Sequence, residues 1–166
     1  EQSDIGAISA WLRLGEQAVE QWDGPKYDRA AFVSALSEIR TLTKLEPADF
    51  EPRLRTIFHQ AGVAFVLVPA IPKAHVSGVA RWLNAHRPLI QLSLYGKSND
   101  KFWFTLFHEA AHILLHAGEK KSVYLDDLRG SGAEADEERE ANDWARDFLI
   151  AAKWEPQLSL LRSEQS

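Results

Sequence analysis

Two histidines with a glutamate between them form the part of this sequence that most directly indicates chemistry. His108 and His112 are four residues apart in an expected helix over Asp100–His116, so both imidazoles lie on one face and can bind one Zn²⁺. Glu109 is turned by about 100° from His108 on such a helix. Its carboxylate then lies beside the metal, where it can accept a proton from the water that the metal activates. The spacing predicts a zinc site with Glu109 as the general base.

A buried helix with incidental polar residues is the alternative interpretation of this segment. The composition of the chain gives about 0.02 chance occurrences of two histidines and a glutamate at this spacing. Three ionisable groups within five positions of an otherwise apolar helix are also costly to bury without partners. Both considerations favour the metal site.

A catalytic zinc needs a third protein ligand, and the chain has no Cys, so this ligand must be His, Asp or Glu. An acidic helix expected over Glu134–Ile150 offers several carboxylates. We expect Glu138, because it lies three residues before an apolar stripe starting at Ala141 and one turn before Asn142, which could orient it. Glu140 is the alternative, since the two glutamates are about 200° apart and only one can face the metal. The other acidic residues in the first turns of this helix are Glu134, Asp136 and Glu137.

Some further side chains could contribute to such a site. His116 follows His112 by four residues, so it could support a metal ligand or donate to an oxyanion, although a partly buried histidine at a helix C-terminus is the simpler interpretation. Tyr95 and Tyr124 could donate to a tetrahedral intermediate, or serve only in packing. We expect three histidines at the surface: His59, His75 and His86.

Helical periodicity dominates the first third of the chain. A first helix carries Ile8 and Trp11 on its apolar face, and Asp28 is a suitable N-cap for a second one. A third helix is expected over Asp49–Ala61, with Gly62 ending it in the left-handed conformation.

Three strands follow, at Val63–Val68, Val76–Leu83 and Pro88–Leu94. The alternation around Gln91 in the last strand indicates one solvent face and one core face. Residues 118–132 resemble a loop. The expected class is α+β, with a small, mostly antiparallel sheet of about three strands packed against the helix of His108 and further helices. An extended substrate would pair with a free sheet edge at Val76–Leu83.

Length and composition limit the function classes. The chain has 166 residues and a net charge of −5, which argues against nucleic acid as its main partner. It has no apolar run of membrane-spanning length and no Cys, and we expect a cytoplasmic protein without membrane contact. Because it begins at Glu1 and contains no Met, we expect a piece of a longer protein. We divide it into a helical connector, 1–46, and a metallopeptidase-like domain, 47–166.

Two separate motifs, in the same order as in a known family, give a more specific indication. Phe102–His116 contains His-Glu-Ala-Ala-His, and Glu138–Ala145 reads Glu-Arg-Glu-Ala-Asn-Asp-Trp-Ala. Together with Val76–Gly78 and Gln91–Ser93, they resemble the ImmA/IrrE family of zinc metallopeptidases. The resemblance covers about residues 50–152. The chain has Ala111 where the family often has glycine, and lacks the usual proline after Ile150.

The resemblance implies a zincin-like, minimal gluzincin fold, with His108 and His112 as zinc ligands, Glu109 as general base and a glutamate of the second motif as third ligand. It also implies a protein or peptide substrate, such as a transcriptional repressor. Many relatives carry an N-terminal helix-turn-helix domain of the antitoxin or repressor kind, so DNA contact would come only through such a domain. The alternative function is a regulatory or toxin-binding module whose zinc is not catalytic.

Overall fold

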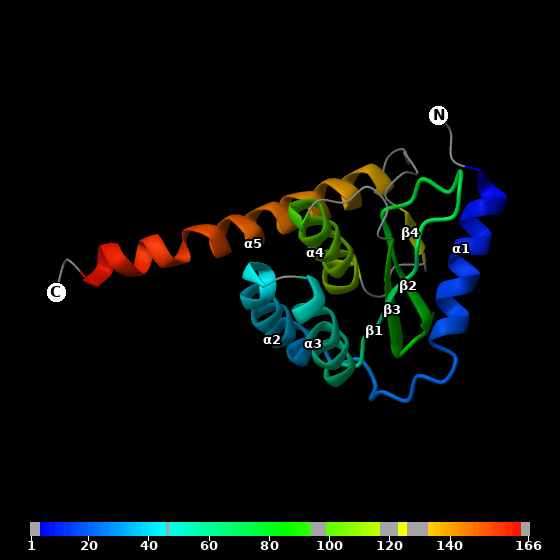
Figure 1. Cartoon of the computed structure of the whole chain (residues 1–166), viewed down its shortest axis with the longest axis horizontal. Helices are drawn as coiled ribbons and strands as arrows, with labels where there is room; N and C mark the ends of the chain where they lie inside the picture. Colours follow the sequence, from blue (N-terminus) through cyan, green and yellow to red (C-terminus); the bar gives the residue numbers. More distant parts are fainter. Residues whose placement is uncertain (1–3, 46, 94–98, 117–122, 126–132, 164–166) are drawn as a thin grey trace.

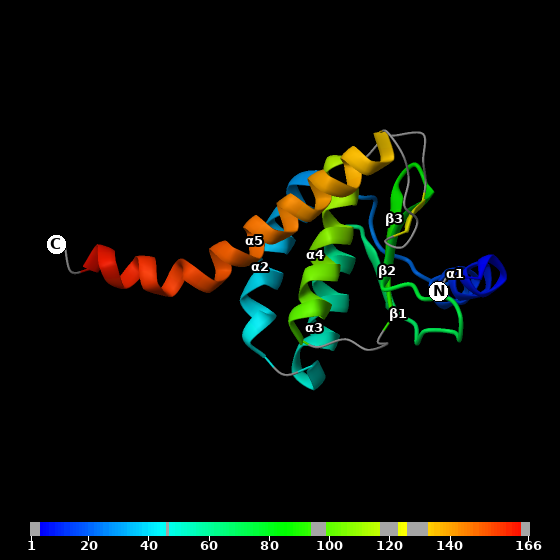
Figure 2. The same ribbon diagram turned by 90° about the horizontal axis from the view of Figure 1, so that it is seen from above.

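The computed structural model describes residues 4–45, 47–93, 99–116, 123–125 and 133–163. Helices and strands do not strictly alternate along the chain. The strands form a mixed sheet, and helices cover both of its faces (Figures 1 and 2). The α+β class expected from the sequence is confirmed. In chain order the elements are α1 (Ile5–Ala18), α2 (Arg29–Thr41), the short 3-10 helix η1 (Leu42–Lys44), α3 (Pro47–Gln60), β1 (Ala64–Leu67), β2 (Gly78–Asn84), β3 (Arg87–Leu92), α4 (Asn99–Leu115), β4 (Val123–Leu125) and α5 (Ala133–Ser163).

The sheet has the strand order β1-β3-β2-β4 in the described part of the chain. β1 runs parallel to β3, whereas β2 is antiparallel to both β3 and β4. The expectation of a mostly antiparallel sheet is confirmed, but β4 lies in a segment that we expected to be a loop. It pairs with Val79–Arg81 of β2, so the predicted free edge at Val76–Leu83 is wrong over those residues.

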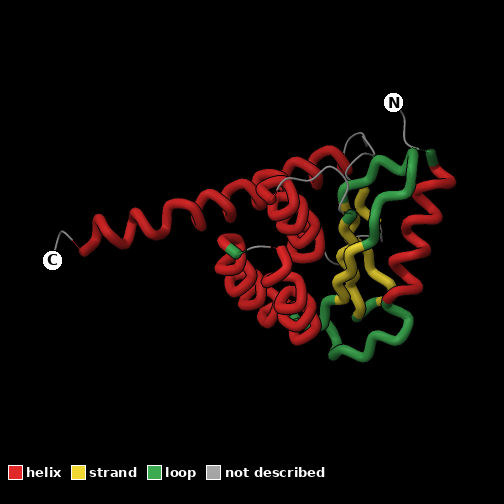
Figure 3. Tube along the Cα trace, viewed as in Figure 1, coloured by secondary structure: helices red, strands yellow, loops and turns green. Residues whose placement is uncertain are grey.

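Both faces of the sheet are covered, as Figure 3 shows. Phe65 and Ile90 point into a core formed with α2, α3, α4 and α5. Val66 and Leu89 point to the opposite face, where α1 covers them. Gln91 also faces α1 and is fully buried, so the predicted solvent face of this strand is wrong. The helix α1 covers this face, and the sequence around Gln91 does not indicate which helix packs against it.

Polar contacts attach α1 to the sheet. The indole Nε1 of Trp11 donates to the carbonyl of Val68 at 3.0 Å, and the amide of Gln91 donates to the carbonyl of Trp11 at 2.8 Å. These bonds satisfy polar groups that burial would otherwise leave without partners. The first helix is therefore an integral part of the sheet packing.

Local sequence signals explain several helix ends. The carboxylate of Asp4 accepts from the amide of Ala7 and caps α1, and Asp28 does the same for α2 through Ala31, which confirms the predicted cap. Gly62 ends α3 with φ of +80°, the left-handed conformation expected for it.

The two helices that carry the candidate ligands pack against each other. Ala141 and Ala145 of α5 are fully buried, and such small residues let α5 approach α4 closely. Beyond this contact α5 extends away from the body to the C-terminal end (Figure 1), 13 residues past the expected end at Ile150. Among the described residues, no helix combines the length and apolarity needed to cross a bilayer.

Candidate functional site

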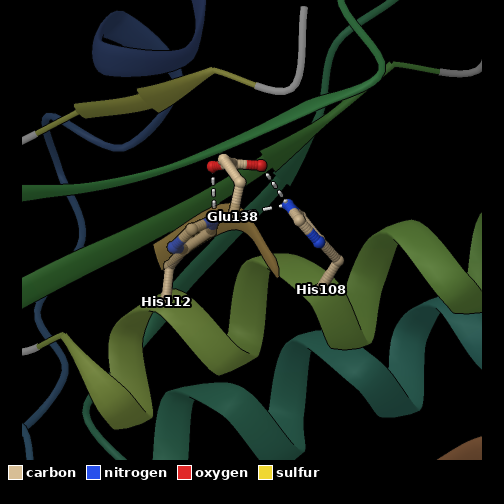
Figure 4. Close-up of side chains that lie close together, drawn as sticks. All are labelled: His108, His112 and Glu138. Carbon is tan, nitrogen blue, oxygen red and sulfur yellow. Dashed lines mark hydrogen bonds and ion pairs between the residues drawn. The ribbon is translucent and has the colours of Figure 1, made fainter. Parts of the chain in front are cut away.

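His108 and His112 both project from the same face of α4, toward the sheet and α5 (Figure 4). Both side chains are buried, with 4% and 0% of their surface exposed. Their Nε2 atoms lie 3.3 Å apart, as expected for residues one helical turn apart whose rings turn toward a common point.

Glu138 reaches the same point from the first part of α5 (Figure 4). Its Oε1 lies 2.8 Å from Nε2 of His112 and its Oε2 lies 3.1 Å from Nε2 of His108. Because Ala141 and Ala145 are buried against the body, the helix is rotated so that Glu138, on the flank of that stripe, points inward. The structure thus brings together the three residues that the sequence indicated as metal ligands.

The local electrostatics set the protonation states of this group. Burial lowers the pKa of His112 below its usual value, although its hydrogen bond to Glu138 and the charge of that carboxylate oppose the effect. For Glu138, burial raises the pKa, but hydrogen bonds from His108 and His112 and the charges of both rings outweigh it and lower the pKa to about 2. Neutral imidazole and ionised carboxylate are the forms that bind a metal.

The three side chains fit a tetrahedral cation. Donor atoms about 2.0–2.1 Å from a tetrahedral Zn²⁺ lie about 3.3 Å from one another. The measured separations are 2.8–3.3 Å, and the possible ligand atoms of the three residues all lie within 4.8 Å of one another. Two nitrogens with one carboxylate, and no thiolate, are a donor set used by catalytic zinc sites. These residues can therefore hold a metal ion.

Glu140, the alternative ligand, lies elsewhere. Its Oε2 is 3.1 Å from Nε2 of His116, and Nδ1 of His116 is 3.1 Å from Nδ1 of His112. His116 is buried, with 5% of its surface exposed, whereas 64% of the Glu140 side chain is exposed. Glu140 thus contacts His116, the neighbour of the candidate ligand His112, and does not lie at the candidate metal position.

Glu109 is fully buried on α4, and β2 approaches it closely. A Cβ atom at Gly78 would lie 3.2 Å from Cγ of Glu109, 3.0 Å from Cγ2 of Thr105 and 2.6 Å from Cδ2 of Leu92. A side chain at this position would require the Leu92 side chain to shift and the two side chains of α4 to give by a few tenths of an ångström. Periodicity did not identify Gly78 as a site residue, although it belongs to the Val76–Gly78 motif of the resemblance.

A cleft of about 230 Å³ opens beside the candidate ligands. His108 and Glu138 form part of its wall, so the candidate metal position is accessible from solvent. Asn142, one turn after Glu138, also faces the cleft. The other residues that line it are Ser77, Lys101, Phe104 and Thr105.

The remaining residues considered in the sequence analysis lie outside the described part of the chain or away from this site. Tyr95 lies outside the described residues, as do the side chains of Tyr124 and Glu134. His59 is 3.4 Å from Asp23 on the surface. His75 and His86 are exposed, as expected.

Comparison with known proteins identifies the family. The sequence matches the family described as the IrrE N-terminal-like domain, Peptidase_M78, over residues 64–153. This range contains β1, both histidines, Glu109 and the first part of α5, and it supports the zincin-like fold expected from the motifs. No curated protein and no solved structure matches the chain. Because the match covers more than half of the sequence, the chain belongs to the Peptidase_M78 family of IrrE N-terminal-like domains.

Proposed function

We propose that this chain is a zinc-dependent endopeptidase with His108, His112 and Glu138 as metal ligands and Glu109 as general base. The observation that carries the proposal is the convergence of two Nε2 atoms and one carboxylate at the wall of an open cleft. An enzyme needs such access, whereas a purely structural zinc is enclosed by four protein ligands. Membership of a peptidase family supports the same activity.

Each residue has a distinct part in the proposed reaction. When bound, Zn²⁺ supplies Lewis-acid polarisation and makes water acidic enough to act as a nucleophile. Glu109 accepts the proton of the attacking water and returns it to the amine of the leaving peptide. Metal binding uses the lone pairs of His108 and His112 in their neutral forms together with the ionised carboxylate of Glu138. Glu109 is fully buried on α4, next to the ligand His108 in the sequence.

The proposed substrate is a protein that regulates transcription, such as a repressor, in the cytoplasm. The family resemblance supports this class of partner. The net charge of −5 argues against direct DNA contact by this chain, so a fused helix-turn-helix domain would provide it.

Substitution of Glu109 tests the proposal. Zinc-loaded parent and Glu109→Gln proteins are incubated with the protein encoded next to this gene, and products are followed by mass spectrometry. We expect the parent to cleave it and Glu109→Gln to be at least about 100-fold slower, with unchanged zinc content. Equal cleavage rates would show that Glu109 is not the base. Zinc binding without any cleavage by the parent would favour the regulatory module instead.

A further inference from the structure

A chain of three side chains runs from the candidate metal position to the surface. His112 faces Glu138 with its Nε2 atom, and its Nδ1 atom lies 3.1 Å from Nδ1 of His116. The Nε2 atom of His116 in turn lies 3.1 Å from a carboxylate oxygen of Glu140. Both rings are buried, while the carboxylate at the end of the chain is largely exposed.

The carboxylate at one end determines where the protons lie in this chain. A carboxylate accepts hydrogen bonds, so in the contact with Glu140 the Nε2 atom of His116 acts as the donor. With a proton on Nε2, the other ring nitrogen of His116, Nδ1, is available as an acceptor. It accepts the proton on Nδ1 of His112, which leaves Nε2 of His112 with a lone pair directed at the candidate metal position.

We propose that His116 and Glu140 are positioning residues that fix His112 in the ring orientation and tautomer needed for metal binding. The inference rests on the proposed zinc site and deepens it. In the metal-free protein the Nε2 atom of His112 carries the proton of its hydrogen bond to Glu138; a metal that replaces this proton requires the remaining ring proton on Nδ1, which is the proton that His116 would accept. This role also explains why a buried histidine follows His112 by one turn, since a neighbour that orients a ligand strengthens metal binding.

Metal affinity, measured by competition with a chromogenic chelator, tests the proposal without reference to catalysis. Glu140→Ala should bind zinc about 10- to 100-fold more weakly than the parent. Asp143→Ala is the matched control, because Asp143 is an exposed carboxylate of the same helix that pairs with Arg146. This control should retain the affinity of the parent.

Two substitutions of His116 separate the effect of its Nδ1 acceptor on zinc affinity from the effect of its volume. His116→Phe keeps a buried ring but offers no acceptor to His112, and we expect a loss of similar size to that of Glu140→Ala. His116→Asn offers an amide oxygen in place of Nδ1 and should bind zinc more tightly than His116→Phe, although it fills less space. Equal affinities of the two variants would show that only packing matters at this position.

Nitrogen-15 NMR of the zinc-loaded protein reads the tautomer directly. We expect His116 as the Nε2–H tautomer in the parent and as a mixture in Glu140→Ala. A proton on Nδ1 of His116 in the parent, or parent affinity in both Glu140→Ala and His116→Phe, would overturn the inference. Glu138→Ala distinguishes this failure from that of the zinc site itself. Loss of binding in Glu138→Ala alone refutes only the positioning role, whereas a parent that binds no zinc refutes both.

Discussion

At the scale of single residues, burial acts differently on groups with partners and on groups without them. Glu138 is ionised despite its burial because two imidazoles contact its oxygens. Tyr27 shows the opposite case. Its hydroxyl is buried without a hydrogen-bond partner among the described residues, and its ring packs edge-on against Phe32 and Trp82. Burial is the largest effect there and, with Asp28 and against Arg29, it raises the pKa of Tyr27 from 10.0 to about 12.

The raised pKa of Tyr27 predicts a loss of stability at alkaline pH. The folded state favours the neutral phenol, so its contribution is complete below pH 10.0 and is lost as the pH rises toward 12. The loss is at most about 2 kcal/mol, because the ring is only partly buried. Urea unfolding at several pH values should show a steeper decline for the parent than for Tyr27→Phe between these limits. Parallel curves for the two proteins would mean that Tyr27 ionises as it does in water.

The site residues were predictable from the sequence only where they follow one another closely. His108, Glu109 and His112 are within one helical turn, so helix geometry alone places them. To choose Glu138 over Glu140 it was also necessary to know how the second helix is rotated about its axis, and the apolar stripe starting at Ala141 indicated this. The contact between His116 and Glu140 was not predicted, because the need for a third zinc ligand indicates Glu138 but nothing in the metal chemistry calls for a second carboxylate at His116.

At the scale of elements, the distance between β2 and α4 determines where Glu109 lies. Gly78→Ala places a methyl group where only 2.6–3.2 Å separates it from Leu92, Thr105 and Glu109. The Leu92 side chain must shift, and α4 must give by a few tenths of an ångström at Thr105 and Glu109; we expect a destabilisation of about 1–3 kcal/mol. Because Glu109 moves with α4, cleavage should slow more than zinc binding weakens. Urea unfolding, zinc titration and cleavage rates measure the three effects.

Val79→Ala is the matched control for this substitution. Val79 is the next residue of β2 and is fully buried on the opposite face, against α1. Its truncation should cost a similar amount of stability and leave the position of Glu109 unchanged. If Val79→Ala slows cleavage as much as Gly78→Ala does, general destabilisation explains both, and the close approach at Gly78 has no special role.

Elements with strong local signals were predicted well, and elements that depend on distant partners were not. The cap at Asp28 and the left-handed Gly62 follow from local chemistry. β4 has only three residues, too few for periodicity, and it exists through pairing with β2. The burial of Gln91 likewise depends on α1. Its side chain donates to the carbonyl of Trp11, which lies 80 residues earlier in the sequence.

At the scale of the whole molecule, the core extends beyond the segment that defines the family. The family match begins at residue 64, yet Trp11 on one side of the sheet and Phe32, Leu36 and Ile39 on the other are at most 1% exposed. The helices α1 and α2 therefore complete the two hydrophobic layers around the sheet. The division of the chain at residue 46 stays a prediction.

The candidate metal ligands lie on α4 and α5, and both helices pack into this core. Zinc binding should therefore stabilise the entire fold. A ligand that binds only the folded state at 100 times its dissociation constant adds about 2.7 kcal/mol, which raises Tm by about 5–10 °C in a chain of this size. We expect this rise in calorimetry when zinc is added to chelator-treated parent protein. Glu109→Gln should show the same rise, because Glu109 is not a proposed ligand, whereas Glu138→Ala should show little or none. An equal rise in Glu138→Ala would place the zinc elsewhere, and no rise in Glu109→Gln would make Glu109 part of the metal site itself.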